Sequence, residues 1–158
     1  MKKNKIEIDF YEAASTENME SIEVRLINKA KSAARKAYAP YSGFSVGAAV
    51  LLENGEIITG SNQENAAYPS GVCAERTALY YAGSTFPDVP VKTMAITALY
   101  QDEFVRLPVT PCGTCRQVIL ETQRRYNSRI RIIMFGEELI RVVDDVICLL
   151  PFPFDKVG

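Results

Sequence analysis

The chain has 158 residues, a length that suits one domain with a single hydrophobic core. Its formal net charge is −1, with 47% hydrophobic and 23% charged residues. A chain this close to neutral has no global basic field to hold a phosphate backbone, which argues against a nucleic-acid-binding protein. The sequence contains no histidine, and this excludes a Ser-His-Asp triad, a Cys-His pair and any imidazole-based metal site.

The sequence predicts a cytoplasmic protein without membrane association. Lysines are frequent in residues 1–5, but Glu7, Asp9 and Glu12 interrupt any apolar stretch that could follow in a secretory signal. No apolar run approaches the length of a transmembrane helix. Cysteines stay reduced in the cytoplasm, so four of them indicate metal or redox chemistry and not a disulfide framework.

Residues 1–14 read as an N-terminal extension of a domain that covers residues 15–158. In the extension Ile6, Ile8 and Phe10 alternate with polar residues, a pattern compatible with a short edge strand. An ordered tail on the surface is a more economical interpretation than a functional segment.

Beyond the extension, helices and strands are mixed. Apolar residues at helical spacing predict a first helix that ends before Pro40, and Asn54-Gly55 predicts the turn of a hairpin. The expected helices cover residues 16–38, 73–83, 112–125 and 144–149. The expected strands cover residues 44–52, 56–61, 91–100, 130–135 and 139–143, with a proline-punctuated loop before residue 112. This order predicts an α/β fold, a three-layer α/β/α sandwich around a mixed sheet.

Three cysteines have the spacing of metal ligands. Cys112 and Cys115 share one face if they open a helix, and Cys73 lies at another predicted helix start. Two helix N-termini aimed at one point would supply three thiolates, leaving a fourth position for water in a catalytic site or for a protein ligand in a structural one. Cys112 and Cys115 alone would equally fit a thioredoxin-like redox pair, which gives Cys73 no role.

The charge balance of such a site gives a role to two arginines. Three thiolates and Zn²⁺ carry one net negative charge, which weakens the Lewis acidity that activates water. Arg76 follows Cys73 by three residues and Arg116 follows Cys112 by four, so each lies on the helical face of a ligand and could hydrogen-bond a thiolate. Without the cysteines, both arginines would be interpreted as solvated surface charges.

Glu75 follows Cys73 by two residues, an offset that suits contact with a metal-bound water better than metal ligation. A carboxylate there could take the proton of that water and deliver it to a substrate nitrogen, although an isolated first-turn Glu needs no such role. Zinc deaminases carry His-x-Glu or its Cys version, followed by Pro-Cys-x-x-Cys, and use zinc-bound hydroxide to attack C4 of cytosine. Cys73-Ala-Glu75 and Pro111-Cys-Gly-Thr-Cys115 fit that signature.

Four segments resemble the small homotetrameric zinc-dependent cytidine deaminase family. They are Tyr41-Ser-Gly-Phe-Ser-Val-Gly-Ala-Ala, the run from Asn62 to Ala78, Pro111-Cys-Gly-Thr-Cys-Arg-Gln, and Leu149-Leu-Pro-Phe-Pro-Phe. The resemblance implies a five-stranded mixed sheet and a homotetramer with active sites at subunit contacts. It also implies Zn²⁺ bound by Cys73, Cys112 and Cys115, with Glu75 as the proton shuttle. The implied reaction is the hydrolysis of cytidine and 2′-deoxycytidine to the uridine products, in pyrimidine salvage.

The resemblance also implies a nucleoside site. Asn62 and Glu64 would bind the ribose hydroxyls, and their spacing places both on one face of an extended segment. Phe44 would stack on the base, the backbone around Ala74 would read it, and Phe154 would be contributed by a neighbouring subunit. Without the resemblance, these residues would be interpreted as loop polar residues, a core aromatic and a C-terminal anchor.

The family often has His-Phe-Pro where this chain has Gly43-Phe-Ser, which predicts a looser approach to the pocket.

Other functions remain open at this point. A zinc deaminase could act on another aminated heterocycle or on polynucleotide bases, although the near-zero charge favours a free nucleoside. A non-enzymatic alternative is a structural zinc module in which Cys148 completes a four-cysteine site.

Overall fold

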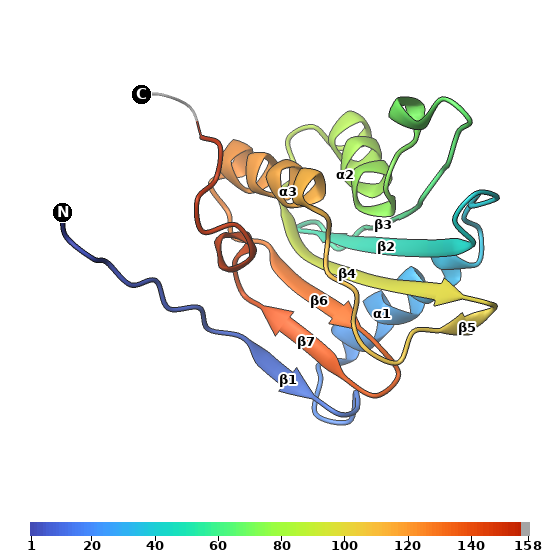
Figure 1. The fold of residues 1–158 in the computed structure, drawn as a ribbon, viewed down its shortest axis with the longest axis horizontal. Helices are drawn as coiled ribbons and strands as arrows, with labels where there is room; N and C mark the ends of the chain where they lie inside the picture. The colour runs from blue at the N-terminus through green and yellow to red at the C-terminus, as the bar shows by residue number, and fades with distance from the viewer. Residues whose placement is uncertain (156–158) are drawn as a thin grey trace.

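A mixed sheet forms the middle layer of the protein, with helices on both faces (Figure 1). The structure, a computed structural model, describes residues 1–155, so the last three residues of the predicted domain lie outside the described part. The strands are β1 (Tyr11–Ala13), β2 (Phe44–Leu52), β3 (Ile57–Ser61), β4 (Val91–Tyr100), β5 (Glu103–Phe104), β6 (Arg131–Phe135) and β7 (Ile140–Val143). The helices are α1 (Ser21–Ala34), α2 (Ala74–Thr85) and α3 (Gly113–Tyr126), with 3₁₀ turns η1 (Tyr68–Ser70) and η2 (Val146–Leu149).

The sheet confirms the predicted three-layer α/β/α sandwich and adds two short strands to the five expected ones. The strand order is β1-β7-β6-β4-β2-β3, with β5 paired to β4 beside this path. The β4–β6 pair is parallel and the other pairs are antiparallel. The additional strands are β1, from the N-terminal extension, and β5, from the expected loop, so the sheet has seven strands and not five.

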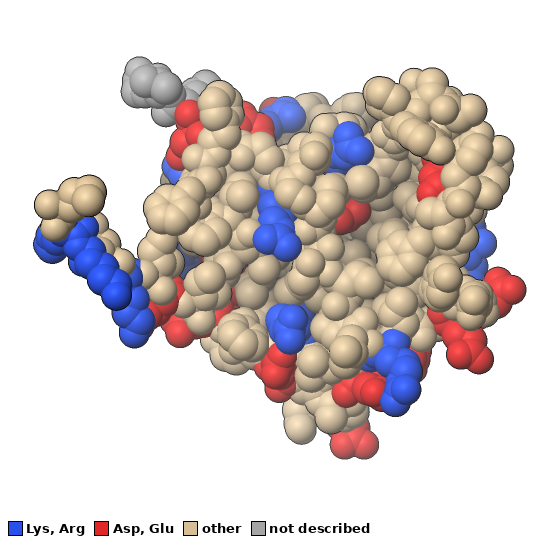
Figure 2. Space-filling model, viewed as in Figure 1, with Lys and Arg blue, Asp and Glu red and all other residues tan. Residues whose placement is uncertain are grey.

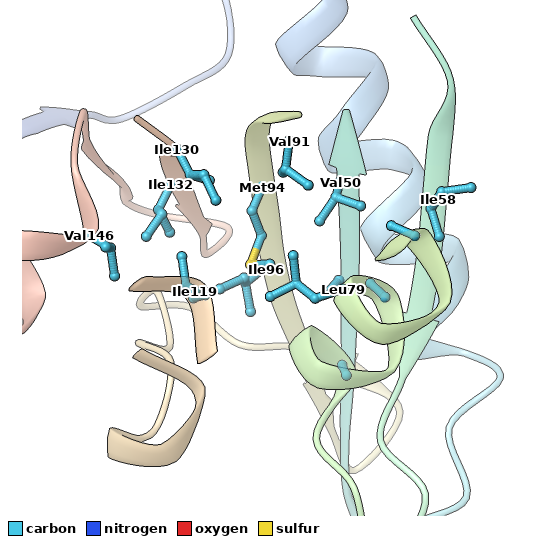
Figure 3. Packing of buried hydrophobic residues seen from close by; sticks show 14 of the residues in the cluster. Val50, Ile58, Leu79, Val91, Met94, Ile96, Ile119, Ile130, Ile132 and Val146 are labelled. Carbon is cyan, nitrogen blue, oxygen red and sulfur yellow. The ribbon is translucent and has the colours of Figure 1, made fainter. Parts of the chain in front are cut away.

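Alternating side chains divide the core between the two faces of the sheet, as the pleat of a strand requires. On one face, α1 packs Leu26, Ile27 and Ala30 against a cluster that includes Ala49 and Ala95. On the other face, α2 and α3 cover a larger cluster. In Figure 3, Met94 and Ile96 of β4 lie between Leu79 of α2 and Ile119 of α3. This second cluster holds the two helices whose N-termini carry the cysteines.

Two glycines allow the helices to touch the backbone of the sheet. A Cβ atom on Gly47 of β2 would lie 2.1 Å from the Ala30 carbonyl oxygen of α1. A Cβ atom on Gly60 of β3 would lie 2.5 Å from the Ala74 carbonyl oxygen and 2.5 Å from the Ala78 nitrogen of α2. Any larger residue at position 60 would therefore displace the first turn of α2, next to Cys73.

The N-terminal extension contributes the edge strand β1, which pairs antiparallel with β7 (Figure 1). The paired residues are Tyr11–Ala13, slightly beyond the alternation of Ile6, Ile8 and Phe10, which are exposed. Glu12 receives hydrogen bonds from Arg141 at 2.7 and 3.0 Å, which fixes β1 on the edge of the sheet.

Surface charges of both signs are interspersed on the face seen in Figure 2. Within residues 1–155, no helix combines the length and the apolar character needed to cross a membrane.

Candidate active site

The three predicted ligand cysteines converge where α2 and α3 begin. Cys73 is the N-cap of α2, Cys112 is the N-cap of α3, and Cys115 lies in the first turn of α3. The Cys73 and Cys112 sulfurs are 4.0 Å apart, and the three sulfurs all lie within 4.8 Å of one another. The backbone N–H of Cys115 also donates to the Cys112 sulfur at 3.4 Å, so the helix N-terminus itself contacts a ligand atom.

This sulfur geometry fits zinc. Tetrahedral coordination with Zn–S bonds of about 2.3 Å implies sulfur separations of about 3.8 Å, so the observed cluster needs only a small contraction. Among residues 1–155, the group of potential ligands holds these three cysteines, while Cys148 lies elsewhere in η2. The donor set is therefore that of a site with three protein ligands.

Arg76 lies against the cysteine cluster, as its spacing from Cys73 predicted. Its Nη2 atom donates to Cys73 Sγ at 3.5 Å. Hydrogen bonds from Cys115 and from Arg76 lower the pKa of Cys73 to about 5, whereas the hydrogen bond to Cys73 and burial raise the pKa of Cys115. The Arg76 guanidinium therefore favours the thiolate form of Cys73.

Arg116 lies in a different environment from the one expected. Its guanidinium donates to the backbone oxygens of Pro111 and Leu149, both at 2.8 Å, and to Thr110 Oγ1 at 3.3 Å. These contacts tie the start of α3 to the C-terminal segment, and within residues 1–155 its hydrogen bonds run to oxygen atoms and not to a thiolate. Its influence on the metal ligands is therefore indirect, through the loop that precedes Cys112.

Glu75 is a buried carboxyl group in the first turn of α2, with only 4% of its surface exposed. Burial is the main reason that its pKa is raised, and the nearby Cys73 charge acts in the same direction. It lines the same cleft as Cys73 and Cys112. A carboxyl group with a raised pKa beside a metal site can both accept and release a proton, which is the chemistry that a proton shuttle needs.

The cleft beside the cysteines has a volume of about 650 Å³, within the usual range for small-molecule sites. It brings together Phe44, Asn62 and Glu64 with Cys73 and Glu75. Thr110 and Cys112 also line the cleft, so the segments 41–46, 62–76 and 109–112, which are far apart in sequence, meet at one place.

Asn62 and Glu64 have a backbone-binding role that the sequence did not indicate. Asn62 Oδ1 accepts from the Val46 N–H at 2.7 Å, and its Nδ2 donates to the Phe44 carbonyl at 2.9 Å. Glu64 Oε2 accepts from the N–H groups of Tyr41 and Ser42 at 2.9 and 3.2 Å. The hydrogen bond from Ser42 and that from the Tyr41 backbone lower the pKa of Glu64, which keeps it ionised.

Phe44 lines the cleft at the start of β2, and its ring lies 6.4 Å from that of Tyr100. The preceding Gly43 has φ +65°, a conformation in which glycine is unstrained, and its N–H donates to the Ala39 carbonyl at 3.0 Å. Gly43 therefore forms a turn at the entrance of β2, and its effect on the approach to the pocket stays a prediction.

Ala74 and Phe154 are not among the residues that line the cleft of their own chain, although Cys73 and Glu75, on either side of Ala74, do line it. Ala74 is fully buried, and its carbonyl oxygen faces the Gly60 position of β3. Phe154 is 83% exposed, and Gln117 of α3 holds it through two backbone hydrogen bonds, at 2.7 Å to its carbonyl and 3.2 Å from its N–H. An exposed ring on an anchored backbone is available to another molecule, and no local pattern in the sequence indicates the Gln117 anchor.

Comparison with known proteins connects this geometry to a family. Residues 20–129 match the cytidine and deoxycytidylate deaminase zinc-binding region. The chain belongs to this family. The matched segment contains the three cysteines, Glu75 and the Asn62/Glu64 pair. The chain is therefore a zinc-dependent enzyme of the cytidine deaminase class.

Relatives of known sequence and structure agree with this assignment. A cytidine deaminase of Sporosarcina psychrophila is 47% identical over 97 residues, covering 61% of this chain and 67% of the relative. One of Halalkalibacterium halodurans is 45% identical over 98 residues, covering 61% and 68%. The crystal structure of a cytidine deaminase from Burkholderia pseudomallei superposes with a TM-score of 0.72 at 36% identity, covering 83% of this chain and 98% of that one.

Proposed function

We propose that the protein hydrolyses the exocyclic amine of cytidine and 2′-deoxycytidine, giving uridine or 2′-deoxyuridine and ammonia. The observation that supports this proposal most strongly is the meeting of three sulfurs and buried Glu75 in one cleft with an aromatic ring and two sugar-binding candidates. The cytosine ring would lie on Phe44, with its amine toward the cysteines, and the sugar would lie toward Asn62 and Glu64.

Zinc held by Cys73, Cys112 and Cys115 would supply the Lewis acidity that activates water for attack on the base. Glu75 would take up the proton released from water and return it to the ring nitrogen and then to the leaving amine. Its burial supports this role, because a raised pKa leaves the carboxyl able to change protonation state during turnover. The Arg76 guanidinium offsets part of the thiolate charge through Cys73.

The remaining hydrogen-bonding capacity of Asn62 and Glu64 suits a sugar hydroxyl. Asn62 Nδ2 has a second N–H beyond the one given to Phe44, and the carboxylate of Glu64 has about four acceptor positions, of which three are occupied. One hydroxyl can therefore receive from Asn62 and donate to Glu64 without breaking an existing bond. A strand of nucleic acid would require basic and stacking residues along a path, and the near-neutral chain favours the free nucleoside.

We also infer the setting in which this activity operates. Residues 15–158 form the deaminase domain and residues 1–14 an extension, in a cytoplasmic homotetramer that serves pyrimidine salvage and neither binds nucleic acid nor associates with membranes. The exposed Phe154 supports the assembly, because its ring would complete the cleft of a neighbouring subunit. A stable monomer with full activity in a sizing experiment would contradict this assembly.

A comparison of the turnover of different substrates tests the proposal directly. Purified zinc-loaded protein should convert cytidine and 2′-deoxycytidine, followed by the loss of ultraviolet absorbance, and should leave adenosine, guanosine and a cytosine-containing oligonucleotide unchanged. Turnover of the oligonucleotide in preference to cytidine would favour a polynucleotide deaminase, and turnover of a different heterocycle would replace cytidine as the substrate.

A further inference from the structure

The segment from Tyr41 to Val46 forms one wall of the cleft, and side chains hold the beginning of this wall. Glu64 Oε2 receives the N–H groups of Tyr41 and Ser42 at 2.9 and 3.2 Å. Asn62 holds the other end through the Phe44 carbonyl at 2.9 Å and the Val46 N–H at 2.7 Å. Asn62 and Glu64, the two candidates for sugar binding, therefore also bind the backbone of the segment that carries the Phe44 ring.

The Ser42 hydroxyl connects the Glu64 carboxylate with the Phe44 backbone. Its hydroxyl donates to Glu64 Oε1 at 2.5 Å and accepts from the Phe44 N–H at 3.0 Å. A serine hydroxyl has a single proton to donate, so its donation to Glu64 orients the oxygen lone pairs toward Phe44. Hydrogen bonds in such a chain polarise one another, which strengthens both.

This chain of hydrogen bonds connects the residue proposed to bind the sugar, Glu64, with the residue proposed to stack on the base, Phe44. The Phe44 backbone is bound on its N–H side by Ser42 and on its carbonyl side by Asn62. Glu64 is bound through one oxygen by Ser42 and through the other by the Tyr41 and Ser42 amides. A rotation of the Glu64 carboxylate would therefore break the bond from the Ser42 hydroxyl, whose oxygen accepts the N–H at the start of the Phe44 strand.

We propose that Ser42 is a positioning residue that fixes the sugar-binding carboxylate of Glu64 and the base-stacking ring of Phe44 relative to each other. The proposal rests on the nucleoside substrate proposed above. It predicts that Ser42 affects the binding of the whole nucleoside and leaves the chemistry at the cysteines unaffected, because Ser42 has no contact with the metal ligands among the hydrogen bonds of residues 1–155.

Replacement of Ser42 by alanine tests this role. Loss of one hydrogen bond to a charged group corresponds to a rise of about tenfold in KM for cytidine. The value of kcat should stay within about twofold, because an interaction made equally in the ground and transition states changes KM alone. Ser42→Thr keeps the hydroxyl and should restore KM, whereas Ser45→Ala, a neighbouring serine that does not line the cleft, should leave both constants unchanged.

A double-mutant cycle identifies the partner through which Ser42 acts. In a Glu64→Ala background the hydroxyl has lost its acceptor and keeps only the Phe44 N–H, so adding Ser42→Ala should lower kcat/KM by clearly less than the roughly tenfold cost of the same substitution in the wild type. On 2′,3′-dideoxycytidine, which lacks both ring hydroxyls of the sugar, the Ser42→Ala penalty should be smaller than on cytidine.

Several outcomes would overturn the proposal: an unchanged KM in Ser42→Ala, a fall confined to kcat, or the full penalty persisting in the Glu64→Ala background. Zinc content and circular dichroism of each variant establish that it is folded. If Ser42→Ala does not retain zinc, Ser42→Cys, with a weaker donor, takes its place and should show an intermediate rise in KM. A wild-type protein that binds zinc but does not convert cytidine would instead refute the proposed function, which separates the two failures.

Discussion

Single residues decide whether the sulfur cluster is catalytic or structural. Cys148 is the fourth cysteine of the chain, and it packs against the larger core cluster from η2, apart from the three grouped sulfurs. A three-cysteine site leaves one coordination position for water, whereas a four-cysteine site leaves none. The separation of Cys148 from the cluster therefore supports the catalytic interpretation of the other three.

Cysteine substitutions should show this difference as zinc stoichiometry. Cys148→Ala should retain about one zinc ion per chain and most of the activity, because Cys148 is not among the clustered ligands. Cys112→Ala should lose most of the zinc, because it removes one of the three ligands. Metal analysis of the two proteins after gel filtration gives the comparison, and loss of zinc in Cys148→Ala would indicate a four-cysteine site.

At this scale the sequence predicted the convergence of the three cysteines, but not the hydrogen bonds that Asn62 and Glu64 make within the chain. The spacing of Cys112 and Cys115 at a helix start is sufficient to place two sulfurs together. The spacing of Asn62 and Glu64 predicts that they share a face, but it does not reveal the backbone groups that they bind, because those groups lie 16 to 23 residues away in the chain. Long-range partners of this kind follow from the fold.

At the scale of elements, α2 carries Cys73 and Glu75, so its position on the sheet determines the site. Gly60 of β3 lies directly under the first turn of this helix, where an added Cβ would meet backbone atoms of Ala74 and Ala78. Backbone cannot move aside as a flexible side chain can, so the whole helix would have to shift.

Gly60→Ala should therefore damage both stability and activity. Overpacking of this kind costs about 1–3 kcal/mol, and displacement of Cys73 and Glu75 should lower kcat. Gly83→Ala is the matched control on α2 itself, because its Cβ would meet only the end of the Arg125 side chain at 3.5 Å. The control should be neutral or stabilising by up to about 1 kcal/mol, since alanine favours helix. Equal thermal stability of the two variants would contradict the close packing of α2.

The N-terminal extension covers the edge of β7 through the strand β1, and we expect this cover to limit aggregation. Deletion of residues 1–13 would expose the backbone groups that pair with β1, and unpaired edges promote association between chains. Light scattering should show more aggregation in the truncated protein, while kcat per folded chain should be retained. Glu12→Gln should aggregate less than the truncation, because it keeps the strand and weakens only a partly exposed ion pair. Unchanged aggregation after truncation would show that β1 has no protective role.

The element boundaries show where local sequence signals are sufficient. Asn54-Gly55 predicted the hairpin of β2 and β3, because that dipeptide favours a tight turn. The β4–β5 turn was missed, because Gln101 and Asp102 adopt positive φ values of 53° and 64° without a glycine. Helix α1 ends at Ala34, earlier than expected, and Tyr38 beyond it exchanges backbone hydrogen bonds with the segment that carries Asn62 and Glu64.

For the whole molecule, the mixed order of helices and strands was enough to predict the layers, but not the two short strands β1 and β5. Strands β2, β4 and β6 carry buried apolar runs, and β3 and β7 carry shorter, partly alternating apolar patterns that the sequence also shows. The outer strands β1 and β5 have only three and two residues, too short for a periodic pattern to be recognised. They pair with β7 and β4, and the pairing of β1 with β7, which lies near the other end of the chain, follows from the tertiary structure and not from a local pattern.

The central claim is that the three cysteines of the assembled fold hold an ion next to a carboxyl group that moves protons. The most direct measurement compares wild type and Glu75→Gln for bound zinc and for cytidine turnover in the same preparations. Glutamine preserves the shape of the side chain and cannot carry the proton, so we expect about one zinc ion per chain in both proteins and a fall in kcat of at least about a hundredfold in the variant. Full turnover by zinc-loaded Glu75→Gln would contradict the account.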